Sequence, residues 1–79
     1  MYVVQAGDVE RWKIGYTSGA LLDRVRGLQT GCPLPLRVVS WIYGPEALEA
    51  EMHHRFRDSR VVGEWFDITD ELRATVEGW

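Results

Sequence analysis

The chain has 79 residues and a formal net charge of −3, which describes one small domain. A single cysteine excludes an internal disulfide, and no four-ligand Cys/His cluster offers a structural zinc site. Stability must therefore come from an apolar core, to which four Trp, three Tyr and two Phe can contribute. Because no charged-then-apolar leader and no long apolar run are present, we expect a soluble, cytoplasmic domain over residues 1–79.

The charge is distributed unevenly along the chain. Residues 1–60 carry eight basic side chains against seven acidic ones, whereas residues 61–79 carry one against five. A negative net charge argues against a nucleic-acid partner, since phosphate binding requires positive charge. The acidity gathers near the C-terminus, however, so a basic face on the first 60 residues remains compatible with the composition.

Two β-favouring runs open the chain, at residues 2–5 and 12–17, and the second alternates apolar and polar side chains. The polar segment between them contains Gly7 and Asp8, which are typical of turns. Two such runs with a short polar connection predict an antiparallel hairpin. Gly15 lies in the second run, where the lack of a side chain lets another group approach closely.

A helix is predicted next, after Thr17 and Ser18 as candidate N-caps and before the helix-ending Gly31 and Pro33. Four residues recur at helical spacing and fall on one apolar stripe: Leu21, Leu22, Val25 and Leu28. Residues 36–43 are the most β-rich stretch of the chain, so we expect them to form a central strand.

A second helix is predicted to begin at Pro45, with Glu49 and His53 one turn apart on a polar row. Its apolar stripe comprises Ala47, Leu48, Met52 and Phe56. A short extended segment at residues 63–67 and a last helix, capped by Thr69 or Asp67, complete the chain. The aromatic residues expected in the core are Trp12, Trp41, Trp65 and Phe66. The order predicts an α+β fold, in which helices flank a small antiparallel sheet.

Four polar residues stand out once the expected core is set aside: Tyr2, Lys13, Arg24 and Glu49. A carboxylate can hold a divalent cation, and an arginine can neutralise a phosphate in its transition state. A hydroxyl or basic group can orient the attacking water. These residue types therefore suit phosphodiester hydrolysis, although the same mixture also occurs on ordinary protein surfaces.

The arrangement of these residues resembles the GIY-YIG nuclease superfamily, in particular its small phage and bacterial branch, over residues 1–69. Tyr2-Val3-Val4 is similar to the first motif strand, and Lys13-Ile14-Gly15 stands where the second motif falls, with lysine replacing its first tyrosine. Arg24 matches the helix arginine, and Leu48-Glu49 resembles the helix that carries a metal-binding glutamate. Residues 28–31 and 63–66 resemble further markers of this branch.

This resemblance implies a three-stranded antiparallel sheet and a phosphodiesterase site with one divalent cation. Glu49 would bind Mg²⁺ or Mn²⁺, and Arg24 would clamp the scissile phosphate. Tyr2 and Lys13 would position or deprotonate the water, and Tyr16 would offer a hydroxyl to the phosphate.

Several further expectations accompany this assignment. DNA is the expected partner, with Arg26, Arg55 and Arg57 as its phosphate contacts, and a homodimer is compatible with the small size. His53 is a candidate accessory residue of the same catalytic site. The alternative is a catalytically silent module that binds nucleic acid or protein on the same scaffold, which the small size and the acidic charge favour.

Overall fold

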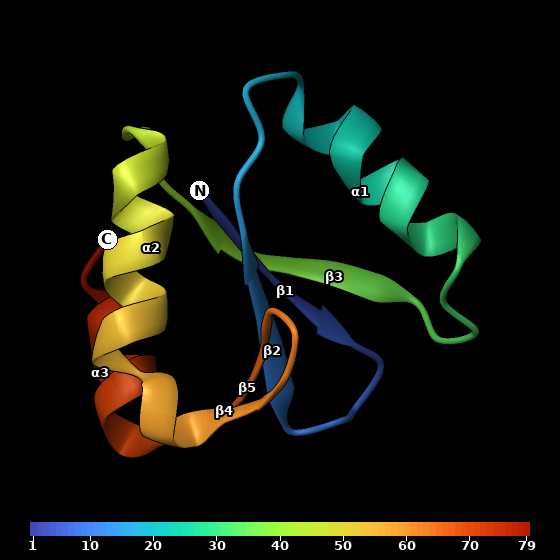
Figure 1. Ribbon diagram of the computed structural model, residues 1–79. Helices are drawn as coiled ribbons and strands as arrows, with labels where there is room; N and C mark the ends of the chain where they lie inside the picture. The colour runs from blue at the N-terminus through green and yellow to red at the C-terminus, as the bar shows by residue number, and fades with distance from the viewer.

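The computed structural model describes all 79 residues and has five strands, three α-helices and one short 3-10 helix (Figure 1). The strands are β1 (Tyr2–Ala6), β2 (Arg11–Gly15), β3 (Leu36–Trp41), β4 (Arg60–Val62) and β5 (Trp65–Asp67). The helices are α1 (Leu21–Thr30), α2 (Glu46–Arg55) and α3 (Asp70–Glu77), with the 3-10 helix η1 (Arg57–Ser59) after α2. The predicted α+β class is confirmed. None of these helices has the length and apolar character needed to cross a membrane.

The sheet has the order β3-β1-β2-β5-β4, and all its neighbouring strands are antiparallel. The prediction of three strands was therefore wrong in number, because residues 60–67 form a hairpin that extends the sheet beyond β2. Gly63 makes the turn of this hairpin with a φ of 54°, in the left-handed region that glycine adopts readily. The sequence did not mark β4 because its valines are exposed, so no buried alternation identifies the strand.

β2, not β3, occupies the middle of the sheet, between β1 and β5. The prediction of a central strand at residues 36–43 was wrong, because β3 ends at Trp41 and lies at an edge, paired only with β1. Trp41 is 52% exposed rather than buried in the core. High β propensity reflects side chains that suit a pleated surface, and it does not distinguish an edge strand from a central one.

The two faces of the sheet have different roles. Val3 pairs with Ile14, and Trp12 pairs with Phe66, on the face that meets Met52 of α2. α3 contributes Leu72 and Val76 to this same core, and Thr69 Oγ1 caps the helix by accepting the Leu72 N–H at 3.1 Å. The other face carries Tyr2 and Lys13, because side chains alternate along a strand.

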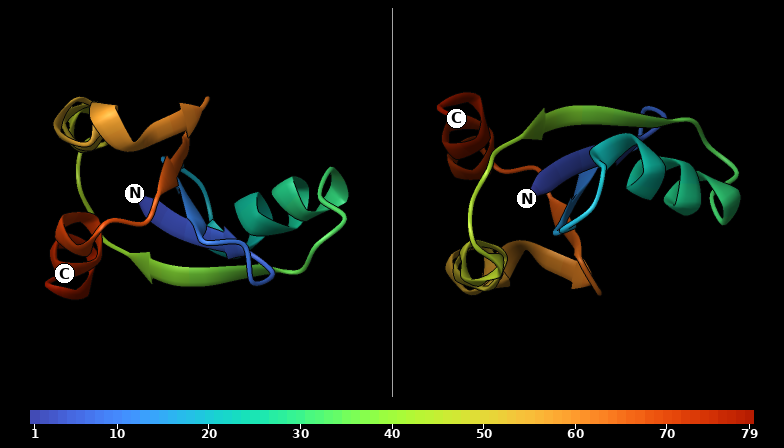
Figure 2. Two further views of the ribbon diagram at one scale, coloured as in Figure 1. Left: turned by 90° about the horizontal axis from the view of Figure 1, so that it is seen from below. Right: turned by 90° about the horizontal axis from the view of Figure 1, so that it is seen from above.

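α1 lies at one end of the molecule, and α2 and α3 lie at the opposite end, separated from each other in both views (Figure 2). Leu21, Val25 and Leu28 are half-buried but Leu22 is 64% exposed, so the apolar stripe of α1 is only partly covered. The helix packs against the edge strand β3, which covers only part of its apolar face. Its N-cap is Ala20 without a side-chain hydrogen bond, whereas Thr17 Oγ1 accepts the N–H of Gly19 at 3.2 Å.

Gly15 provides the close approach expected at the end of β2. A Cβ atom there would overlap the hydroxyl of Tyr2 and would lie 2.5 Å from its Cζ atom. Gly15→Ala must therefore displace the buried Tyr2 ring, and we expect it to lower the free energy of unfolding by about 1–3 kcal/mol, the range for overpacked cores. Urea denaturation measures this change.

The matched control is Gly27→Ala in α1, where a Cβ atom would meet nothing within 4 Å. This substitution should stabilise the domain by about 0.5–1 kcal/mol, because alanine loses less backbone entropy than glycine in a helix. Equal effects of the two substitutions would contradict the packing described here.

Candidate active site

α2 presents Glu49 and His53 toward the end of β2. His53 Nε2 lies 2.9 Å from the carbonyl oxygen of Ile14, and its ring meets Phe66 edge-on with centroids 4.9 Å apart. The carbonyl oxygen can only accept, so Nε2 carries the proton and donates it. The helix is thereby tied to the central strand at the residue just before Gly15.

Glu64 joins this pair from the turn between β4 and β5. Its backbone carbonyl accepts the N–H of Ile14 at 2.9 Å, which fixes the turn against the end of β2. One ligand atom from each of Glu49, His53 and Glu64 lies within 4.8 Å of the others, and all three residues are half-buried. Two carboxylates and an imidazole therefore converge from an α-helix and a hairpin turn.

The two carboxyl groups have opposite pKa shifts. The pKa of Glu49 is raised to about 7, first by burial and then by its hydrogen bond to Glu64 and by the negative charge of Glu64. Burial also acts to raise the pKa of Glu64, but hydrogen bonds from Glu49 and Lys13, with the charges of Lys13 and His53, lower it overall. At neutral pH, Glu64 is therefore the carboxylate and Glu49 is partly protonated, which relieves the repulsion between them.

This shift predicts a pH dependence of stability in the metal-free protein. The folded state holds the Glu49 proton more tightly than the unfolded chain, so stability falls as the pH rises from 4.5 toward 7. Glu49→Gln keeps a neutral donor beside Glu64. We expect it to stabilise the domain by about 1–2 kcal/mol at pH ~8, less than the full shift implies because water screens part of the carboxyl group.

At about pH 4 the Glu49 carboxyl group is protonated in the folded parent and therefore neutral like the amide of the variant. The two proteins should then have similar free energies of unfolding. Urea denaturation in EDTA at both pH values measures the two differences. A variant less stable than the parent at the higher pH would show that Glu49 is favourably charged in the folded protein.

Lys13 points toward this cluster and not into solvent. Its side chain is 17% exposed, and Nζ lies 3.3 Å from Glu64 Oε1. Nζ also lies 5.7 Å from the centroid of the Trp65 ring, its cross-strand partner. Lys13 thus contributes a positive charge and N–H donors at the edge of the carboxylate pair.

Tyr2 and Arg24 form the other side of the site. Arg24 Nε donates to the Tyr2 hydroxyl at 3.4 Å, linking α1 to β1 across the space beside Gly15. The hydrogen bond to Tyr2 raises the pKa of Arg24, and the charges of Glu64 and Glu49 raise it further. The guanidinium is exposed, so one end of the site is a solvent-accessible cation.

The cluster has the donors that a hard divalent cation prefers. Mg²⁺ and Mn²⁺ bind carboxylate oxygens, and Glu49 and Glu64 supply two such groups. His53 Nε2 is occupied by the carbonyl oxygen of Ile14, so this nitrogen orients the helix instead of offering a lone pair. Burial and the neighbouring charge of Glu64 raise the pKa of Glu49, and a bound cation would favour its ionised form.

No side-chain hydrogen bond or ion pair joins the remaining sequence candidates to this group. Tyr16 follows β2 and is half-buried. Arg26 pairs with Asp23 at 3.8 Å on α1. Arg55 pairs with Glu71 of α3 at 3.3 Å, and Arg57 donates to the His54 carbonyl at 2.8 Å. The structure therefore brings together Tyr2, Lys13, Arg24, Glu49 and His53, and leaves the three arginines elsewhere.

Glu64 is the member of the site to which sequence reasoning assigned no role. It belongs to the quoted marker Gly63-Glu64-Trp65-Phe66, but nothing in that segment indicated a partner for its carboxylate. The available signal was the acid beside a turn glycine, directly before a strand. Only the pairing of β5 with β2 shows that this acid reaches Lys13.

The α+β domain gathers acids, a lysine, an arginine and a tyrosine beside one central strand, which are residue types that a nuclease-like domain uses. The chain is a member of the T5orf172 domain family, whose profile matches residues 1–79. The comparisons with curated proteins and with solved structures gave no match. Family membership supports a nuclease-like domain with DNA as its partner, whereas the GIY-YIG assignment and its Lys-Ile-Gly motif stay predictions.

Proposed function

We propose that this domain is an endonuclease that hydrolyses DNA phosphodiester bonds with the help of Mg²⁺ or Mn²⁺. The observation that carries the proposal is the carboxylate pair Glu49 and Glu64, which shares one small region with Lys13 and with the Tyr2–Arg24 pair. The negative charges of Glu64 and Glu49 both raise the pKa of Arg24, so the two sides of the site interact electrostatically.

The carboxylates of Glu49 and Glu64 would hold the cation, which when bound supplies positive charge to a phosphoryl oxygen. Arg24 is the exposed donor beside them and can contact another oxygen of the same phosphate. Its donors stabilise charge that develops in the transition state.

Tyr2 and Lys13 complete the proposed roles. The Tyr2 hydroxyl already accepts from Arg24, so its own proton is free to meet a water molecule or a phosphate oxygen. Lys13 is held against Glu64 and acts as a donor to the leaving or non-bridging oxygen. Tyr16 is a further hydroxyl near the end of β2.

One observation favours the alternative of a catalytically silent nucleic-acid- or protein-binding module. Lys13 Nζ lies 3.3 Å from Glu64 Oε1, so one of the two carboxylates already has a positive partner without a metal. A fully neutralised pair would have little affinity for a divalent cation.

Supercoiled plasmid incubated with Mg²⁺, with Mn²⁺ or with EDTA separates the two functions. The endonuclease gives nicked circles with either cation and none in EDTA. Calorimetric titration with Mn²⁺ should reveal one site per chain. Salt-sensitive DNA binding without nicking and without a Mn²⁺ site would establish the silent module instead.

A further inference from the structure

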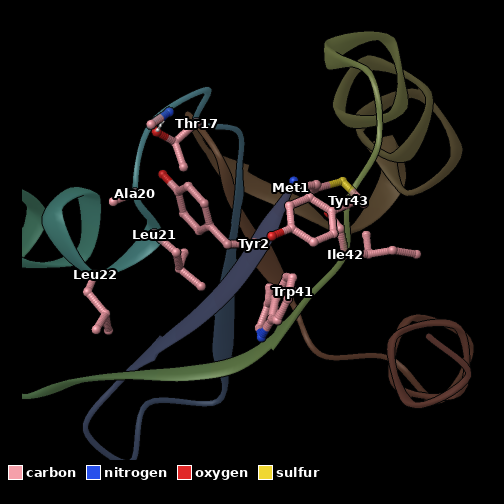
Figure 3. Close-up of a pocket in the computed structure, with 10 residues that line it drawn as sticks. Met1, Tyr2, Thr17, Ala20, Leu21, Leu22, Trp41, Ile42 and Tyr43 are labelled. Atoms are coloured by element: carbon pink, nitrogen blue, oxygen red, sulfur yellow. Dashed lines mark hydrogen bonds between the residues drawn. The ribbon is translucent and has the colours of Figure 1, made fainter.

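An apolar groove lies directly beside the proposed site (Figure 3). It has a volume of about 390 Å³. We call it the aromatic groove; it is lined chiefly by Tyr2, Ala20, Leu21, Leu22, Trp41 and Tyr43. Figure 3 shows Trp41 and Tyr43 on one side, the start of α1 on the other, and Tyr2 between them.

Two aromatic residues of the groove are unusually exposed. Trp41 is 52% exposed and Tyr43 is 89% exposed, and their rings meet edge-on with centroids 5.1 Å apart. In a chain this small, exposed aromatic side chains gathered beside a hollow indicate a binding surface. Because both side chains are exposed, they offer aromatic surface to a planar partner.

The chemistry of the groove selects an uncharged, planar occupant. None of its lining side chains is charged, so the groove provides no charged side chain to pair with a phosphate. A second hollow shares Thr17, Gly19 and Ala20 with the groove and contains Arg24. A ligand that spans both hollows must therefore carry a planar apolar group next to an anion.

A nucleic-acid strand has this alternation of bases and phosphates. Tyr2 connects the two halves of the surface, because its ring lines the groove while its hydroxyl accepts from Arg24. A phosphate at Arg24 therefore places a neighbouring base at the groove. A base can enter only when it is unstacked and unpaired, since duplex bases are enclosed in the stack.

We propose that the aromatic groove holds an unpaired base beside the scissile phosphate, so that the domain acts on single-stranded or locally unpaired DNA. This inference names a substrate class for the proposed nuclease and rests on that function. Trp41 and Tyr43 are the stacking platform, and Arg24 fixes the adjacent phosphate.

The test measures binding without cleavage. In EDTA, fluorescence anisotropy compares a labelled oligothymidylate with a blunt duplex of equal length. Trp41→Ala should weaken single-strand binding by about 5- to 100-fold, the effect of removing one stacking partner, and should change duplex binding less than about twofold. Val62→Ala, which removes an exposed apolar side chain on β4, is the control and should change neither.

Unchanged single-strand binding, or an equal loss for duplex and single strand, would overturn the proposal. Sedimentation of the same proteins tests another occupant, since a dimer that Trp41→Ala dissociates would show that the groove contacts a second copy. A nicking assay keeps the two proposals distinguishable. If the parent cleaves but Trp41→Ala retains its preference for unpaired DNA, only the groove assignment fails. If nothing cleaves while Trp41-dependent binding persists, only the nuclease assignment fails.

Discussion

Glu49→Gln is expected to lower Mg²⁺-dependent nicking of supercoiled DNA by about 100- to 10,000-fold, because the proposed cation site supplies several kcal/mol of transition-state stabilisation. The amide has the shape of the protonated carboxyl group and can still donate to Glu64, but it cannot provide an anionic ligand. The apparent affinity for Mn²⁺ should fall in parallel. Nicking rates and calorimetric titration measure the two effects.

Glu51→Gln is the matched control, since Glu51 lies exposed on the same helix and the substitution makes the same chemical change. It should retain the parent's nicking rate and Mn²⁺ affinity. Glu49→Gln with parental activity would eliminate the proposed role of Glu49. The urea denaturation of the same variant shows whether a loss of activity has unfolding as its cause.

Arg24→Ala should reduce nicking by about 100- to 1,000-fold, as expected when one positioned donor to a developing charge is removed. Mn²⁺ affinity should change little, because the guanidinium is a donor and cannot be a ligand. The combination of lost activity with retained metal binding separates Arg24 from Glu49. Because Arg24 is exposed, we expect little loss of stability.

Arg26→Ala supplies the comparison on the same helix. Arg26 is exposed and paired only with Asp23, at 3.8 Å. Its loss should leave the nicking rate within about threefold of the parent, since Arg26 has no ion pair with the site and its exposed pair with Asp23 contributes little to stability. If Arg26→Ala and Arg24→Ala lost activity equally, the effect would arise from general charge and not from a phosphate contact at Arg24.

The sequence pattern predicted correctly those strands and helices whose apolar residues recur at regular spacing and are buried in the structure. The alternating run through β2, the hairpin with β1 and the capped helix α3 followed directly from side-chain periodicity and from Thr69. The prediction failed where the structure leaves an apolar residue exposed, as at Trp41. Apolar character alone does not say whether a partner surface exists.

Tyr2, Lys13, Arg24 and Glu49 were identified as candidates from the sequence, through residue type and through the GIY-YIG resemblance. What they contact was decided only by tertiary structure. Lys13 meets Glu64 because β5 pairs with β2, a contact between residues far apart in the chain. The raised pKa of Glu49 likewise depends on burial and on a neighbour from the β4–β5 turn.

The sequence by itself determined the class of fold, the secondary-structure elements with strong periodicity, and the residue types available for phosphodiester chemistry. The tertiary structure decided which acid accompanies Glu49, which strand lies at the centre, and where Trp41 and Tyr43 are exposed beside Tyr2. The physical reason is that periodicity is a property of neighbouring residues, whereas electrostatic coupling and burial are set by segments that meet only after folding.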